Sequence, residues 1–330
     1  MGQLGLVVTL IGLGGTHPEQ DIFSTAAWAL GVASFSALQD VAVEAYRIES
    51  VGKDQQGTAA SAMAIGWQCG VMASGAGALY IASFFSWEIA YQLMALLIGV
   101  GIVTTLVSPS VSVYKPTPQK KHSFRKWVNI TYRVPFKLLF HRLNWPLVLS
   151  FILFFKVGDT VLSVMNSPFL VDVGFTKIEI AHTAKMFGIS AMIVGGIAGG
   201  VLLNRLGIVA SLTIAITFQF ISSLLFAIQA LIGHHIGFLV LVVGLENFSG
   251  GFGCTAFIVY LSSFCRIPYT ATHFALLSSF GSLARIFLSM GAGALADRVA
   301  WPLFFTLTAL GCLPCLCLLW FFFERKERGG

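Results

Sequence analysis

Long apolar segments follow one another along almost the whole chain of 330 residues, and this pattern most limits the possible folds. Most segments reach the roughly 20 residues that a helix needs to cross the hydrocarbon core of a membrane. Hydrophobic residues make up 56% of the sequence and charged residues only 10%, whereas a soluble domain has about 25% charged residues. The predicted fold is all-α, a polytopic helical membrane protein, because helices satisfy their own backbone hydrogen bonds in lipid.

Ten helical segments are expected. They cover residues 2–16, 22–47, 57–83, 88–108, 145–167, 180–204, 208–231, 236–264, 270–296 and 300–323. The first is shorter than a complete membrane span. The predicted domains are a first helical bundle at 1–108, a linker at 109–144, a second bundle of six helices at 145–323 and a tail at 324–330.

The linker is strongly basic, since the residues from Pro109 to Asn144 include eight Lys or Arg and no acid. The positive-inside rule places this linker and the C-terminal tail in the cytoplasm. The net charge of +6 is therefore interpreted as membrane topology, and no nucleic-acid partner is expected. Within the linker, Arg133–His141 reads RVPFKLLFH, which predicts a short amphipathic helix on the anionic inner leaflet.

Charged residues inside the apolar segments are the strongest functional signal, because each costs about 2.5–3.5 kcal/mol to insert into a membrane. The second segment carries Gln39, Asp40, Glu44 and Arg47. Asp40, Glu44 and Arg47 are spaced i, i+4 and i+7, so they share one face of a helix. A purely structural role for two acids with one basic partner is the weaker interpretation.

Further polar residues recur at every third segment. Lys156 and Asp159 lie in the fifth segment, and Glu246 and Asn247 lie in the eighth. Such spacing is typical of transporters built from three-helix repeats, in which equivalent helices surround a cavity near the membrane midplane. A carboxyl group in a poorly hydrated site binds a proton more readily than in water. We therefore predict a pathway for substrate and protons along these residues, together with Arg285 of the ninth segment.

Structural roles are the alternative for several of these residues. Arg47 could lie at the cytoplasmic interface, Lys156 and Asp159 could form a pair that only fixes helix packing, and Glu246 could face a water-filled end. The spacing of Cys312 and Cys315 resembles a zinc site, but no second ligand pair is present, so both are interpreted as small hydrophobic residues. We predict no metal site, cofactor or catalytic residue, and no enzyme signature is recognised.

Three motifs resemble those of the AmpG-type muropeptide permeases, which are proton-driven members of the major facilitator superfamily. ALQDVAVEAYRIE resembles the signature of the family's fourth helix, with Gln39 and Asp40 at its Gln–Asp pair and Glu44 where Asp is common. NSPFLVDVGFTKIEIAHTAKMFG is similar to the segment joining the seventh and eighth helices. GGVLLNRLG is similar to the loop after the eighth helix, with Asn204 where Asp is usual.

The resemblance implies proton-coupled import of a small glycopeptide, GlcNAc–anhydroMurNAc peptide, across a bacterial inner membrane. It assigns the ten segments to helices three to twelve of twelve, so an N-terminal truncation that removes helices one and two is expected. Gln39 and Asp40 are expected to bind the sugar or couple protons, and Asp172 and Gly174 to form a structural external turn. Two alternatives remain: transport of another anionic solute such as acetyl-CoA, or a truncated membrane protein without transport activity.

Overall fold

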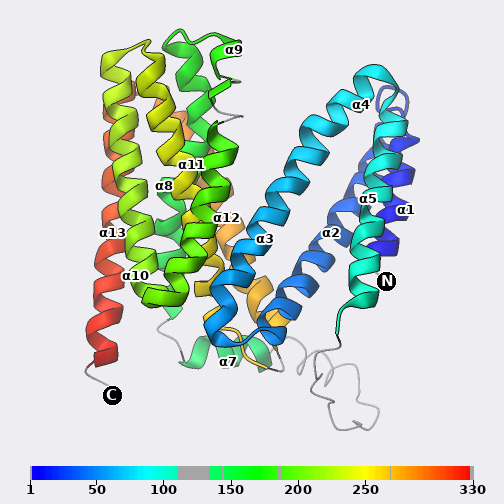
Figure 1. The fold of residues 1–330 in the computed structure, drawn as a ribbon, viewed down its shortest axis with the longest axis horizontal. Coiled ribbons are helices and arrows are strands. Elements are labelled where there is room, and N and C mark those ends of the chain that lie inside the picture. Colours follow the sequence, from blue (N-terminus) through cyan, green and yellow to red (C-terminus); the bar gives the residue numbers. More distant parts are fainter. Residues whose placement is uncertain are drawn as a thin grey trace. The chain divides into compact units, whose positions relative to one another are not determined.

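The computed structural model describes residues 2–109, 134–142, 145–180, 182–183, 187–267 and 269–327, and these residues are almost entirely helical (Figure 1). The N-terminal elements are α1 (Gly2–Gly14), α2 (Ile22–Ser50), η1 (Lys53–Gln55), α3 (Gln56–Met72), η2 (Ala73–Gly77), α4 (Ala78–Phe84) and α5 (Trp87–Val107). They are followed by α7 (Val134–Arg142), α8 (Trp145–Asp172), α9 (Lys177–Ile180), α10 (Gly188–Ile232), α11 (Ile236–Ser263), α12 (Thr270–Ala296) and α13 (Trp301–Glu327).

The all-α membrane fold predicted from the sequence is confirmed. In the described part of the chain, seven helices are long and apolar enough to cross a membrane. One of them, α10, consists of two helices that meet at Gly207, where φ is 81°. A further expected segment is divided into the consecutive elements α3, η2 and α4, and α1 is a short apolar helix. These elements account for the ten segments that the apolar pattern predicts.

The chain divides into two compact units, and the first comprises residues 1–50 and 66–119. Within it, α1 packs against both α2 and α5. Small residues allow this approach, because a Cβ atom on Gly12 would overlap the Trp28 ring of α2. The Gln3 amide nitrogen also donates to Thr105 Oγ1 at 3.2 Å. The Ser86 hydroxyl caps the start of α5 by accepting from the backbone N–H of Ile89.

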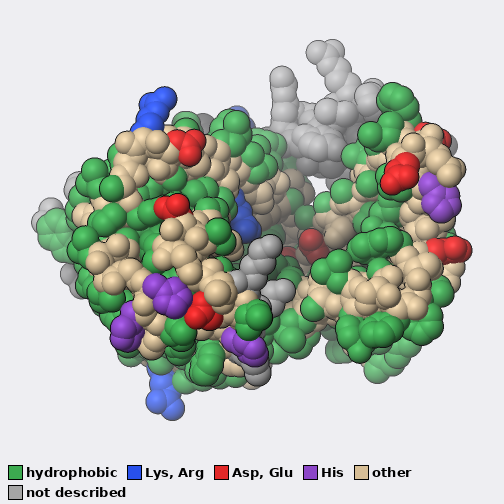
Figure 2. Space-filling view, turned by 90° about the horizontal axis from the view of Figure 1, so that it is seen from above, with side chains coloured by type: hydrophobic (Ala, Val, Ile, Leu, Met, Phe, Trp, Pro, Cys, Tyr) green, Lys and Arg blue, Asp and Glu red, His purple; other side chains and the backbone are tan. Residues whose placement is uncertain are grey.

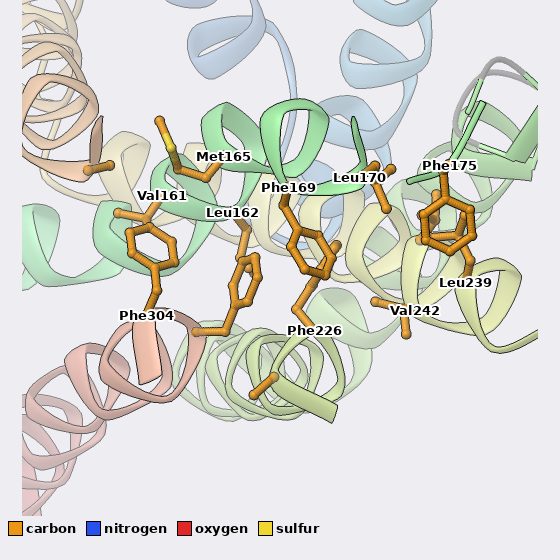
Figure 3. Packing of buried hydrophobic residues seen from close by; sticks show 14 residues of the cluster. Val161, Leu162, Met165, Phe169, Leu170, Phe175, Phe226, Leu239, Val242 and Phe304 are labelled. Atoms are coloured by element: carbon orange, nitrogen blue, oxygen red, sulfur yellow. The ribbon is translucent and has the colours of Figure 1, made fainter. Parts of the chain in front are cut away.

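The second unit comprises residues 51–65 and 120–330 and contains an aromatic core. Figure 3 shows this core between α8, α10, α11 and α13, where Phe169 and Phe226 lie against each other and Phe304 lies beside Val161. The Phe169 ring meets Phe305 edge-on at a centroid distance of 4.8 Å, a favourable geometry for aromatic pairs. These contacts hold α8 and α11, which carry the polar residues predicted from the sequence, in fixed positions.

The sixth expected segment differs from the structure at its start. The sequence predicts one helix from residue 180, whereas the short helix α9 covers Lys177–Ile180, residues 182, 183 and 187 lie in wider π-helical turns, and α10 begins at Gly188. Thr176 and Glu179 explain the separate short helix, because the Glu179 carboxylate accepts from the backbone N–H and the hydroxyl of Thr176. Elsewhere the expected limits agree with the helices to within a few residues.

The outer surface is that of a protein in contact with lipid. Even at the helix ends, which Figure 2 shows from above, hydrophobic side chains are plentiful and Lys and Arg side chains are few. The exposed large hydrophobic residues include Phe23 at 85% and Leu106 at 81%. Exposing so much apolar surface to water would cost a large free energy, whereas lipid chains solvate it at little cost.

Candidate functional site

Glu44 and Arg47 of α2 form an ion pair with each other. Both side chains are buried, and Arg47 Nη2 and Nε each lie 2.9 Å from the same carboxylate oxygen, Glu44 Oε2. Such charge-assisted hydrogen bonds offset the cost of removing two charges from water. The spacing of Glu44 and Arg47 in the sequence predicts this shared face correctly. The pair is a fixed feature of the first unit.

Gln39 and Asp40 lie one turn before this pair on the same helix. Asp40 is exposed and forms no ion pair among the residues that the structure describes. Gln39 is half-buried, and its Oε1 atom has no hydrogen-bond partner in the described chain. An unpartnered amide oxygen beside an unpaired carboxylate leaves hydrogen-bonding capacity for a ligand or a proton.

Lys156 and Asp159 form the second predicted pair, on α8. Lys156 Nζ lies 3.2 Å from Asp159 Oδ2, and the two side chains are 19% and 32% exposed. Lys156 Nζ also lies 4.9 Å from the centroid of the Phe257 ring of α11, a cation–π contact. The pair therefore links α8 to α11 while both charges stay partly accessible.

Glu246 of α11 is held by amide groups. Its Oε2 atom accepts from Asn247 Nδ2 at 3.0 Å and from Asn166 Nδ2 of α8 at 3.4 Å. Glu246 has no basic partner within 4 Å among the described residues. A half-buried carboxylate with amide donors and no cation is an unusual arrangement for a group that only stabilises the fold.

Asn166 is a site residue that sequence reasoning missed. Its Nδ2 atom reaches Glu246, while its Oδ1 atom is buried without a hydrogen-bond partner in the described chain. A signal was present, because Asn166 follows Asp159 by seven residues and so lies on the same face of α8. The motif containing Asn166 was recognised, but only as part of a loop signature.

Same-face spacing on a helix, which could have identified Asn166, does not explain where Arg285 and Gln219 lie. Arg285 is exposed on α12 and forms no ion pair among the described residues. Gln219 of α10 is 3% exposed, and a Cβ atom on Gly158 or Gly253 would lie within 3.3 Å of its amide group. This buried amide lies where α8, α10 and α11 meet, and no sequence motif marks it.

The arrangement offers hydrogen bonds and charges, and no catalytic constellation is recognised. Carboxylate, amide and ammonium groups can bind hydroxyl and amide groups of a polar solute, and an unpaired carboxyl can carry a proton. Within the described ranges, no group of three His, Cys, Asp or Glu residues could hold a metal ion. The polar groups of each unit, taken by itself, are therefore suited to binding and release of a polar solute.

Curated relatives cover most of the chain. A putative AmpG 4 transporter of Rickettsia felis is 32% identical over 95% of this chain, which spans 76% of that protein. The anhydromuropeptide permease of Escherichia coli K12 is 30% identical over 96% of this chain, which spans 64% of that protein. These matches include α2, α8 and α11, the helices that carry the polar residues.

Solved structures show the same fold at low identity. The Escherichia coli fucose:proton symporter aligns with a TM-score of 0.68 and 12% identity, covering 97% of this chain and 83% of that chain. A human organic anion transporter aligns with a TM-score of 0.71 and 15% identity, covering 96% of this chain and 75% of that chain. The family model of the Major Facilitator Superfamily matches residues 1–266. This chain therefore belongs to the Major Facilitator Superfamily, among the AmpG-type membrane transporters.

Proposed function

We propose that this protein imports anhydro-muropeptides, the GlcNAc–anhydroMurNAc peptides released from peptidoglycan, together with protons. The name of the Escherichia coli relative supports the substrate class. The proposed location is the bacterial inner membrane with a cytoplasmic C-terminus, because the basic linker and tail fall on one side of the predicted topology. We also propose that two helical bundles, at residues 1–108 and 145–323, are joined by the basic linker. No nucleic-acid partner is proposed.

One observation supports the proposal: polar side chains lie inside apolar helices at every third segment, and two of the carboxylates have no basic partner among the described residues. In the described part of the chain, Asp40 of α2 forms no ion pair and Glu246 of α11 has only amide partners. Placing such groups in a membrane costs free energy, which a purely structural role does not repay. A carrier that binds a proton and a polar solute in turn requires groups of this kind.

Each residue has a proposed role. Asp40 carries the proton, because Glu44 is occupied by Arg47. Gln39 and Asn247 provide hydrogen bonds for the hydroxyl and amide groups of the substrate. Lys156, Asp159, Glu246 and Arg285 line the path, with Lys156 positioned to attract the carboxylates of the peptide part.

Uptake into intact cells tests the proposal. Cells that lack their own importer and express Met1–Gly330 are given labelled GlcNAc–anhydroMurNAc peptide, with acetyl-CoA as a competitor in a parallel sample. We expect uptake that a protonophore abolishes and that unlabelled muropeptide, but not acetyl-CoA, competes. Membrane fractionation checks that the protein is inserted. Uptake that persists without a proton gradient would refute proton coupling, and inserted protein without any uptake would refute the transport function of this chain.

A further inference from the structure

Two asparagine side chains hold the Glu246 carboxylate of α11 through one of its two oxygen atoms. Glu246 Oε2 accepts from Asn247 Nδ2 at 3.0 Å and from Asn166 Nδ2 of α8 at 3.4 Å. Asn247 Nδ2 also donates to the backbone carbonyl of Val243 at 2.9 Å, so both of its hydrogens are used. These contacts all lie within the second unit, and they fix the orientation of the carboxylate.

The polar atoms that stay free in this cluster are acceptors. Glu246 Oε1 forms no hydrogen bond, and Asn166 Oδ1 has no partner, in the part of the chain that the structure describes. The ammonium group of Lys156 lies 3.2 Å from Asp159 and is occupied there. The cluster of Glu246, Asn166 and Asn247 therefore offers oxygen atoms and a charge that no described cation within 4 Å balances.

The cluster lies on an open face of the two helices. Glu246 and Asn247 are half-buried, and Ser163, one turn before Asn166 on α8, is exposed. One turn after Glu246, a Cβ atom on Gly250 would meet nothing within 4 Å. There is therefore room beside the carboxylate for a group of the solute.

Free acceptors without free donors restrict the kind of group that can bind. An amide N–H donates a hydrogen bond and offers no acceptor on its nitrogen. A hydroxyl group also donates, but it brings two acceptor lone pairs, and both hydrogens of Asn247 Nδ2 are already used. A carboxylate would be repelled by the charge of Glu246. The cluster is thus complementary to an amide N–H.

We propose that Glu246 Oε1 accepts a hydrogen bond from an acetamido N–H of the solute, so that Glu246 selects amino sugars that carry this group. Asn166 and Asn247 are positioning residues, because they hold Oε2 and leave Oε1 free for the solute. The inference rests on the proposed function for the identity of the solute. It adds the group that is recognised and the residue that recognises it.

Calorimetric titration of the purified full chain in detergent tests the inference. The two probes are the disaccharide GlcNAc–anhydroMurNAc and an analogue in which an ester oxygen replaces the N–H of both acetamido groups. The titration is run at pH 8, which favours the ionised carboxylate, because only this form is purely an acceptor. We expect wild type to bind the amide probe at least about tenfold more tightly than the ester, as a hydrogen bond to a charged group would give.

Glu246→Gln gives the sharpest comparison, because the two asparagines orient the introduced amide. They still donate to its oxygen, so its nitrogen should take the place of Oε1 and oppose the N–H of the solute. The preference for the amide probe should then disappear or reverse. Asn166→Leu removes one positioning contact and should reduce the preference by about threefold. Asp297→Asn, at an exposed carboxylate just after α12, is the matched control and should keep the wild-type preference.

Equal affinity of wild type for the two probes would overturn the inference and leave the proposed function in place. A preference that Glu246→Gln retains would overturn it as well, and one that Asn166→Leu leaves unchanged would overturn the positioning role. Folded wild type that binds neither probe would contradict both the inference and the proposed function. The wild-type comparison needs no variant, so it decides the question even if a variant yields too little folded protein.

Discussion

The two units differ in how deeply they bury the ion pair that each carries inside an apolar helix. On α2 of the first unit, Glu44 and Arg47 are the buried residues, and they neutralise each other. On α8 and α11 of the second unit, the buried residues are mostly apolar, while Lys156, Asp159 and Glu246 stay partly accessible. Lipid can cover apolar side chains without help from protein, but a charge needs a protein partner or water. Because the Glu44–Arg47 pair lies within one helix, it neutralises charge on α2, while the packing of α2 in the first unit comes from its contact with α1.

Truncation of a buried aromatic side chain should have the largest effect on the free energy of unfolding. Phe169 of α8 is 0% exposed, so Phe169→Ala leaves a cavity and should lower the free energy of unfolding by about 3–5 kcal/mol. Phe23 of α2 is 85% exposed, so Phe23→Ala should change it by less than about 1 kcal/mol. Unfolding in detergent, followed by tryptophan fluorescence, measures both variants. Equal losses would show that the exposed Phe23 contributes as much to stability as the buried Phe169 does.

Breaking the ion pair should have the next largest effect. Arg47→Ala leaves the Glu44 carboxylate buried without its partner, which should cost about 3 kcal/mol of stability. Glu44→Gln in the same chain removes the stranded charge and should recover much of the loss. The double-mutant cycle is measured by the same unfolding assay. Additive losses in the double-mutant cycle would contradict a stabilising interaction between Glu44 and Arg47.

A substitution at the close contact between α3 and α10 in the second unit should have a moderate effect on stability. The Gly57 backbone N–H of α3 donates to Asn204 Oδ1 of α10 at 3.1 Å, and Ser61 Oγ donates to the Gly196 carbonyl at 2.7 Å. A Cβ atom on Gly200 would meet Ser61 and the Gly57 carbonyl oxygen. Gly200→Ala should therefore force the two helices apart and cost about 1–3 kcal/mol.

Gly250→Ala is the matched control for this contact, since a Cβ atom there meets nothing within 4 Å. It should be neutral or slightly stabilising, because alanine restricts the unfolded chain more than glycine does. The two melting curves are compared directly. A harmless Gly200→Ala would mean that α3 and α10 are not tightly held together.

The smallest effect is expected at Glu179, outside the membrane-spanning helices. Hydrogen bonds from the backbone N–H and hydroxyl of Thr176, and from His234, lower the pKa of Glu179 below its ordinary value. A lowered pKa stabilises the fold above the unfolded pKa, and this contribution disappears as pH falls through the folded pKa. Glu179→Gln should therefore melt slightly below wild type at pH 7, with the difference vanishing in acid. A constant difference across pH would contradict this assignment.

The apolar pattern was enough to predict the helices of this protein, because helix formation in lipid depends on local sequence. The spacing of the charged residues placed Glu44 and Arg47 on one helix face and left a Lys156–Asp159 pair as an alternative, and in the structure each of these couples forms an ion pair. Contacts between side chains on different helices could not be predicted from the sequence. The contact of Asn166 with Glu246 depends on how α8 and α11 are rotated against each other, which one sequence does not state.

Asn204 illustrates the same limit. The sequence shows an asparagine where the resembled family has aspartate, but not what the side chain does. In the structure its Oδ1 accepts from Gly57 and its Nδ2 donates to Thr58, so both ends of the amide are used at the start of α3. Aspartate could accept the first hydrogen bond and could not donate the second. The substitution therefore fits the local hydrogen bonding.

Solute exchange and solute accumulation in proteoliposomes, measured side by side, test the central claim most directly. Wild type, Asp40→Asn and Glu246→Gln are each given labelled GlcNAc–anhydroMurNAc peptide, first with unlabelled peptide inside and then with an imposed proton gradient. Glu88→Gln, at the start of α5, is the control carboxylate. We predict that Asp40→Asn retains exchange but loses accumulation by about tenfold or more, while Glu88→Gln behaves as wild type. Accumulation by both Asp40→Asn and Glu246→Gln at the wild-type level would contradict the account.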